Sequence, residues 1–222
     1  MTLWSDISAI FSAFASQDSW EIRNALQSNA AWVLGTIAAA LGGVLVMLVY
    51  RLVPLLDRHL ERTIMVWSYL AIAFIIFWGV IDRFVFKNQQ PWSTTIPPLL
   101  FMVMAWFGAA FNVRLRTHLS FNEFRTIMPR WAQMGCLTLD AVLWFGFAVI
   151  VFVTTTRMTA LSASNFQIVL GTDSVLQWWF LITAPLAFIL MIGRVFENLA
   201  DDIRNFRSGA PLIKQAVIGG DV

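Results

Sequence analysis

Five long apolar runs, separated by shorter polar or basic segments, dominate the pattern of hydrophobic and polar positions along this 222-residue chain. The runs cover residues 31–53, 66–86, 96–113, 134–156 and 175–196. Each is close to the roughly 20 residues that a helix needs to cross a hydrocarbon layer ~30 Å thick. We therefore predict an all-α, polytopic integral membrane protein with four core transmembrane helices and one additional N-terminal membrane helix.

The first 30 residues follow a different pattern. Leu3, Ile7, Ile10 and Phe14 have the spacing of one face of a helix, and Ser and Asp residues lie between them. Residues 3–14 contain no Lys or Arg, so attraction to anionic lipid does not drive the placement of this amphipathic segment. We expect it to lie at the membrane interface or to pack on another subunit.

The composition agrees with a membrane protein, because 59% of the residues are hydrophobic and only 13% are charged, against about 25% charged in soluble domains. The single cysteine, Cys136, excludes an intramolecular disulfide and a metal site built on several thiolates. Gly-rich phosphate loops, nucleophile elbows and metal-ligand spacings are missing from the sequence. We expect no enzymatic activity and no cofactor.

The basic residues are distributed unevenly over the segments between the runs. If all five runs cross the membrane, most of the 15 Lys and Arg fall on one side, and the positive-inside bias places that side in the cytoplasm together with the C-terminus. The N-terminal segment is then external. The first run, in which Gly35, Gly42 and Gly43 favour close helix contact, could instead lie shallowly or re-enter. That alternative leaves four spans and a cytoplasmic N-terminus.

Several polar residues near the ends of the runs are candidates for structural or subunit-interface contacts. Arg114, Arg116 and His118 cluster at one predicted cytoplasmic end, where they either anchor the topology by reaching lipid phosphates or contact a partner subunit. Asp82 and Arg83 lie near the opposite, external end, and adjacent residues do not share a helix face, so we expect them to have different partners.

Two further candidates lie within the fourth and fifth runs. Asp140 lies about two turns inside its run, where an ionised carboxylate is costly unless it is paired or hydrated. It either pairs with a basic side chain, such as Arg114, Arg116 or one from a partner, or lies in a hydrated position near the interface. Arg194 and Glu197 have i, i+3 spacing and can pair on one helix face.

A series of polar, aromatic and proline residues occurs in a characteristic order near the ends of the runs: Asp82–Phe86, Pro91 and Trp92, Phe107–Ala110, Arg114, His118, Trp178, Trp179, Pro185, Met191 and Arg194. Their order resembles the small, Q-type (DctQ-like) membrane subunit of tripartite ATP-independent periplasmic (TRAP) transporters over residues 64–200. Two features depart from that family: Thr94 and Thr95 stand where many relatives have an acidic residue, and the region before about residue 60 is extra.

The resemblance implies a four-helix Q-type domain at 64–200. It is preceded by the amphipathic segment 1–30 and by a membrane helix with a basic loop at 31–63, and it is followed by a cytoplasmic tail at 201–222. It also implies a scaffold, in the bacterial inner membrane, for a large M-type subunit that carries sodium and a carboxylate-type solute delivered by a periplasmic binding protein. Nucleic acid is not an expected partner, whereas lipids are.

Two other functions stay open. One is a membrane anchor for a redox or other peripheral complex, although the only histidines, His59 and His118, lie in predicted loops and not within spans, where haem ligands are expected. The other is a stand-alone carrier, which the scarcity of polar residues within the runs disfavours.

Overall fold

The computed structural model describes residues 3–116 and 122–213, and every regular element within these ranges is helical. The prediction of an all-α protein is confirmed. An isolated β-bridge between Ile168 and Leu176 lies in the connection before the last helices. In chain order the elements are α1 (Leu3–Ser16), α2 (Ser19–Gln27), α3 (Asn29–Leu52), α4 (Pro54–Ile81), the π-helix η1 (Asp82–Phe86), α5 (Trp92–Leu115), α6 (Asn122–Ile127), α7 (Arg130–Ser164), α8 (Trp178–Leu181) and α9 (Thr183–Ser208).

Five helical segments are long and apolar enough to cross a membrane, namely α3, α4 with η1, α5, α7, and α8 with α9. They correspond to the five predicted runs, but several boundaries differ, two of them by about twelve residues. The predicted basic loop before residue 64 is instead the first part of α4, which Pro54 begins. Proline suits this position because its φ is preset and the N–H that it lacks would have no helical partner. At the other end, α9 continues to Ser208, into the predicted tail.

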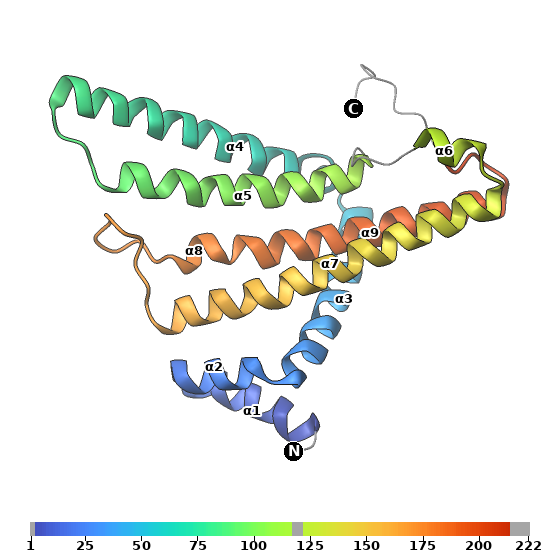
Figure 1. The fold of residues 1–222 in the computed structure, drawn as a ribbon, viewed down its shortest axis with the longest axis horizontal. Helices are drawn as coiled ribbons and strands as arrows, with labels where there is room; N and C mark the ends of the chain where they lie inside the picture. Colours follow the sequence, from blue (N-terminus) through green and yellow to red (C-terminus); the bar gives the residue numbers. More distant parts are fainter. Residues whose placement is uncertain (1–2, 117–121, 214–222) are drawn as a thin grey trace.

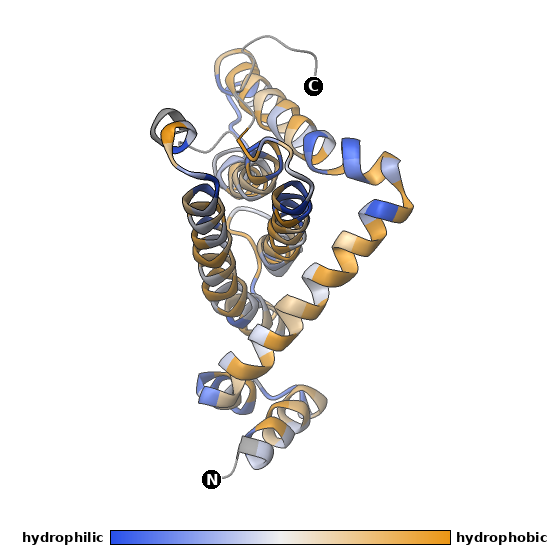
Figure 2. Ribbon diagram, turned by 90° about the vertical axis from the view of Figure 1, so that its right-hand side faces the viewer, coloured by the Kyte–Doolittle hydropathy of each residue, from blue (hydrophilic) through white to orange (hydrophobic). Residues whose placement is uncertain are grey.

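Four helices lie lengthwise beside one another. The antiparallel pair α4 and α5 lies next to the antiparallel pair α7 and α9 (Figure 1). α9 is the central helix, because Phe188, Met191 and Ile192 are fully buried, whereas α4 exposes apolar side chains along most of its length. Hydrophobic residues cover most of the length of the helices (Figure 2). This surface suits contact with lipid or with other membrane helices.

α3 runs across α7 and α9 and ends where α4 begins (Figure 1). It packs on α9 through glycines, which confirms the predicted close contact: a Cβ added to Gly43 would lie 2.3 Å from Cγ2 of Ile192, and one added to Gly193 would lie 2.6 Å from Cγ1 of Val46. Because a larger residue has no room at either position, the two helix backbones approach closely.

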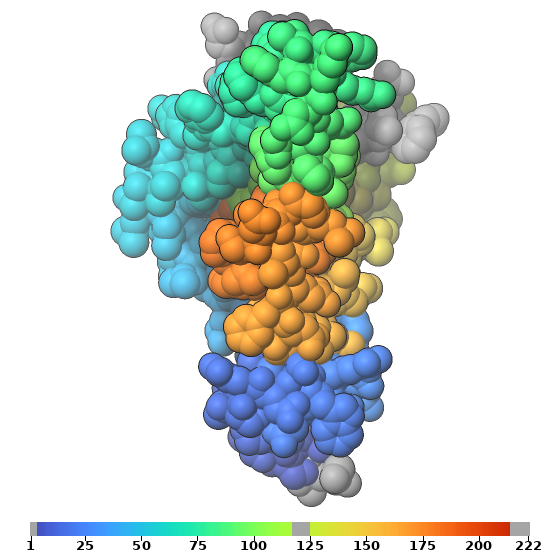
Figure 3. All heavy atoms as spheres, turned by 90° about the vertical axis from the view of Figure 1, so that its left-hand side faces the viewer, coloured from blue at the N-terminus to red at the C-terminus, as the bar shows by residue number. Residues whose placement is uncertain are grey.

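The N-terminal helices α1 and α2 pack against each other and against the start of α3 and the end of α7. They lie at the opposite end of the molecule from α4 and α5, with α7 to α9 between them (Figure 3). Ile10 and Ala13 of α1 are buried together with Ile22 and Leu26 of α2. Part of the amphipathic stripe therefore packs within the chain, whereas the sequence favoured an interface or another subunit.

Candidate functional site

Arg194 of α9 is the most completely bonded charged residue of the interior. Its side chain is 1% exposed, and its Nε and Nη2 donate to the two carboxylate oxygens of Glu61 at 2.8 and 2.9 Å. Nη1 donates to the Asp57 carboxylate and, at 2.9 Å, to Glu197, and Nη2 also donates to the Asp57 carbonyl oxygen at 2.8 Å. An arginine has five N–H donors. The structure gives each of them an acceptor.

Tyr50 attaches α3 to the same arginine. The centre of the Arg194 guanidinium lies 3.9 Å from the centroid of the Tyr50 ring, and the Tyr50 hydroxyl donates to Glu61 at 3.1 Å. A guanidinium over an aromatic face is attracted by the ring quadrupole, more strongly where water is excluded. The contact therefore fixes the end of α3 where it meets α4.

Arg114 attaches α5 from the other side. It donates to the second carboxylate oxygen of Asp57 at 3.2 Å and to the carbonyl oxygen of Arg58 at 3.3 Å. Asp57 thus bridges two arginines from different helices. We call this group the Arg194 centre; it joins α3, α4, α5 and α9, and its members are Tyr50, Asp57, Glu61, Arg114, Arg194 and Glu197.

The spacing along α4 and α9 explains how the centre forms. Asp57 and Glu61 are four residues apart, so both project from one face of α4. Arg194 and Glu197 are three apart on α9, and their predicted pair is present. Charges in an apolar environment each cost several kcal/mol unless they are paired and hydrogen-bonded. The complete pairing is what allows three carboxylates and two guanidinium groups to lie among apolar helices.

Arg116 fastens the end of α5 to α9. It takes a left-handed backbone conformation with φ 54°, and its Nη1 donates to Asp202 at 2.7 Å. Its other nitrogens donate to the side chain and backbone oxygens of Asn198, whose amide in turn donates to the Val113 carbonyl. Arg114 and Arg116 therefore bind groups of this chain, where the sequence left lipid phosphates or a partner subunit as alternatives. His118 lies outside the described residues.

Asp140 is paired, but not with either arginine named from the sequence. Arg125 of the short helix α6 donates to its two carboxylate oxygens at 2.5 and 3.1 Å. Arg114 and Arg116 do not pair with Asp140 because they form ion pairs with Asp57 and Asp202. The hydrogen bonds that Arg125 donates to Asp140 raise the pKa of the Arg125 guanidinium, which therefore stays ionised.

Arg130 caps the far end of α9, a role that the sequence did not indicate. Its Nη1 donates to the Gly209 carbonyl at 2.6 Å, and Nη2 donates to the carbonyl oxygens of Asn205, Phe206 and Ala210. The last carbonyls of a helix have no partner within the helix and carry partial negative charge. The guanidinium satisfies both needs at once.

The opposite end of the molecule has few charges. Asp82 begins η1, and its backbone carbonyl accepts the N–H groups of Lys87 and Asn88. The exposed Arg83 lies over the Phe84 ring at 5.8 Å. The structure does not bring Asp82 or Arg83 to any other predicted site residue within the described ranges.

Trp92 belongs to a contact between the two connections at this end. It begins α5 and is half-buried, and Gly171 packs so tightly here that an added Cβ would lie 2.9 Å from the Trp92 nitrogen and 2.8 Å from the Pro91 carbonyl carbon. Thr95 donates to the Leu170 carbonyl at 2.7 Å. Where many relatives are expected to have an acidic residue, this chain therefore has a neutral hydroxyl that donates to a backbone carbonyl.

The family of tripartite ATP-independent periplasmic transporters, DctQ component, matches residues 72–205, which is more than half of the chain. The chain belongs to the DctQ family. The sialic acid TRAP transporter small permease protein SiaQ of Vibrio cholerae is 25% identical to it over 164 residues, which are 72% of this chain and 92% of that protein. The predicted relationship is confirmed, and this DctQ protein is the small permease subunit of a TRAP transporter.

The family match divides the Arg194 centre. Arg114, Arg194 and Glu197 lie within the matched residues, whereas Tyr50, Asp57 and Glu61 precede them. These last three were also missed by sequence reasoning, which placed Asp57 and Glu61 in a loop. The usable signal was their four-residue spacing after Pro54, which predicts two carboxylates on one face of a helix.

Proposed function

We propose that this DctQ protein is the fixed membrane scaffold of a sodium-coupled, binding-protein-dependent transporter for a carboxylate-type solute. The large M-type subunit carries solute and sodium, and this subunit binds neither. The observation that carries the proposal is the saturation of the Arg194 guanidinium, which is buried in the helix bundle. All five donors of Arg194 bind acceptors of this chain, which leaves none for a substrate carboxylate.

Rigidity supports the scaffold role. A transport domain that moves through the bilayer needs a neighbour that stays in place, and the Arg194 centre joins four helices into one unit. The close packing of Gly43 against Ile192 holds α3 to that unit. Bonded interiors of this kind resist small displacements because packed cores deform little.

The outer surface of α4 supports contact with a large membrane partner. Trp67, Leu70, Phe74 and Phe77 are exposed at spacings that place them along one side of the helix, and Trp67 is 68% exposed. Aromatic residues are enriched where proteins meet. The large subunit is the partner that this family implies, and it would cover part of this surface.

The proposed solute class is supported by the solute of a relative. SiaQ is named for sialic acid, which is a carboxylated sugar. A carboxylate solute delivered by a periplasmic binding protein agrees with that name.

We further propose four lengthwise spans, with the Arg114 end in the cytoplasm and the Trp92 end in the periplasm. The course of α3 across the other helices supports the four-span alternative (Figure 2). A reporter fused to residue 1 tests it. A cytoplasmic signal agrees with four spans, and a periplasmic signal would overturn this arrangement in favour of five.

Co-purification in mild detergent tests the scaffold function. We expect a large polytopic subunit to accompany the chain, and the pair to give sodium-dependent uptake of a carboxylate in liposomes when the binding protein is added. The isolated small subunit should bind neither solute nor sodium in calorimetry. Recovery of the chain as a stable oligomer by itself, or solute binding to it alone, would contradict the proposal.

A further inference from the structure

The corner between α3 and α4 carries three exposed arginines. Arg51 lies in the last turn of α3, and Arg58 and Arg62 lie four residues apart in the first turns of α4. Within residues 3–116 and 122–213, none of the three side chains forms an ion pair. We call these three residues the basic corner. They differ from Arg114, Arg116, Arg125 and Arg194, each of which binds a carboxylate of the chain.

The two faces of α4 explain why the basic corner lacks counter-ions. Asp57 and Glu61 project inward, where Arg194 and Arg114 bind them. Arg58 and Arg62 each follow one of these acids by a single position, so they project from a different face and stay exposed. The nearest carboxylates in sequence are thus already neutralised by other cations, and the positive charge of the basic corner faces outward.

Apolar side chains accompany these cations. Leu52 is 80% exposed and Leu55 is 69% exposed, and both lie at the turn between the two arginine-bearing segments. The N-terminus of α4 adds positive partial charge because Val53, which precedes it, provides no capping side chain. A dissolved anion needs only the cations. The neighbouring leucines fit a ligand that has both a phosphate and hydrocarbon chains.

We propose that the basic corner binds the phosphate of an anionic phospholipid, with Leu52 and Leu55 against its acyl chains. Guanidinium groups form strong, charge-assisted hydrogen bonds with phosphate oxygens. Basic residues near an anionic membrane surface are each attracted to it substantially. The proposal does not depend on the transporter function, because it concerns only the surface of this chain.

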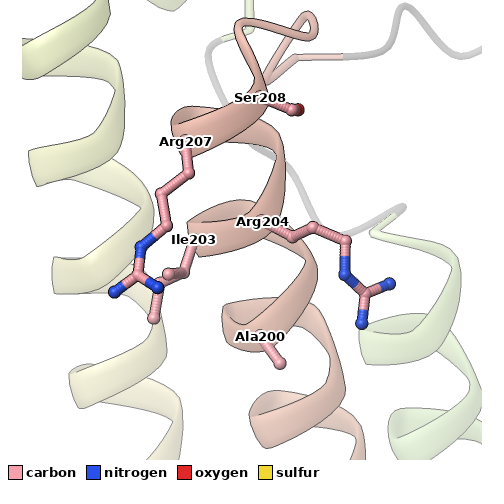
Figure 4. Close-up of a pocket in the computed structure, with 5 residues that line it drawn as sticks. All are labelled: Ala200, Ile203, Arg204, Arg207 and Ser208. Atoms are coloured by element: carbon pink, nitrogen blue, oxygen red, sulfur yellow. The ribbon is translucent and has the colours of Figure 1, made fainter.

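A second exposed arginine pair provides a matched control. Arg204 and Arg207 border a shallow concavity on α9 together with Ala200, Ile203 and Ser208, but their guanidinium groups point to opposite sides of the helix (Figure 4). Arg204 also faces Asp201 at 3.5 Å. This pair carries the same charge as Arg58 and Arg62 without converging on one ligand.

Native mass spectrometry of the full chain in detergent tests the proposal, with phosphatidylglycerol and phosphatidylcholine of identical acyl chains as probes. We expect tighter binding of phosphatidylglycerol. The double variant Arg58→Gln/Arg62→Gln should weaken it by roughly tenfold or more, given the attraction of each basic residue to anionic lipid. Arg204→Gln/Arg207→Gln should change the affinity of the tightest phosphatidylglycerol site by no more than about twofold, since only charges that lie close together can bind one headgroup.

Four results would overturn the proposal. Equal binding of the two lipids would show an unspecific apolar surface, and equal loss in both double variants would show a simple effect of net charge. Competition by inorganic phosphate at low millimolar concentration would indicate a free-anion site. An acidic partner protein in place of lipid would appear as unchanged phosphatidylglycerol binding by Arg58→Gln/Arg62→Gln together with lost recovery of the large subunit. Unchanged thermal unfolding of each variant establishes that it is folded.

Discussion

The two ends of the helix bundle are held together by different means. At one end, arginines from α5, α6, α7 and α9 bind carboxylates and helix carbonyls, and the Arg194 centre is the most buried of these groups. At the other end, the connections before α5 and α8 touch through backbone at Gly171 and through the hydroxyl of Thr95. Buried ionic contacts stabilise the fold only when every charge has its partner, whereas the backbone contact at Gly171 depends on room for close approach. The two ends should therefore fail differently when single residues are changed.

The largest effect is expected for Arg194→Leu. It leaves the buried Glu61 without its cation and Asp57 with Arg114 alone, and breaking a buried ion pair on one side costs about 3–5 kcal/mol. The free energy of unfolding in detergent, measured by chemical denaturation, checks this. Arg204→Leu, at an exposed and weakly paired site, is the control and should change it by less than about 0.5 kcal/mol.

A double variant distinguishes lost pairing from lost packing. Arg194→Leu/Glu61→Leu removes both charges of the principal pair, and such replacements are often neutral or stabilising. We expect it to recover much of the loss of the single variant. If both variants are equally unstable, the centre stabilises the bundle through side-chain shape and not through charge pairing.

An intermediate effect is expected for Gly171→Ala at the other end. The glycine has φ +81°, which costs other L-residues about 1–2 kcal/mol, and the new Cβ would meet backbone atoms of Pro91 and Trp92. We expect the unfolding midpoint to fall and proteolysis between α7 and α8 to accelerate. Gly146→Ala, where an added Cβ meets nothing within 4 Å, is the matched control. Equal stability of the two variants would contradict the tight contact.

The smallest effect is expected for Thr95→Val. It removes the hydrogen bond to the Leu170 carbonyl, and a typical hydrogen bond contributes about 0.5–1.5 kcal/mol. Hydrogen exchange of the connection from Phe166 to Gln177 should rise, while exchange near Arg194 should not. Thr94→Val is the comparison, because Thr94 bonds only within its own turn. Similar exchange in both variants would show that Thr95 does not hold the connection.

Local spacing and hydropathy predicted much of the fold. The five apolar runs became the five long helices, and the pairing of Arg194 with Glu197 followed from three-residue spacing within one helix. The depth of Asp140 left a paired and a hydrated carboxylate as alternatives, and the structure has it paired. These features depend on neighbours within a few turns, which is the range that a periodic pattern describes.

The remaining features depend on contacts between distant residues. Glu61 and Arg194 are 133 positions apart, and Thr95 and Leu170 are 75 apart. Asp57 and Glu61 look solvated because their segment is rich in charge, and only the arrival of Arg194 makes them interior residues. The partner of Asp140 was mistaken for the same reason: it depends on how α6 lies against α7, which no local spacing encodes.

The position of Arg194 in the last long helix has a consequence for biosynthesis. Asp57 and Glu61 leave the ribosome early, and the guanidinium that binds both carboxylates follows 133 residues after Glu61. Until α9 enters the membrane, Asp57 has only one of its two arginines, Arg114, and Glu61 lacks the arginine that it binds in the folded chain. The first half of the chain thus completes its interior only at the end of translation, so a truncated chain presents Glu61 without its cation to the quality-control machinery of the cell.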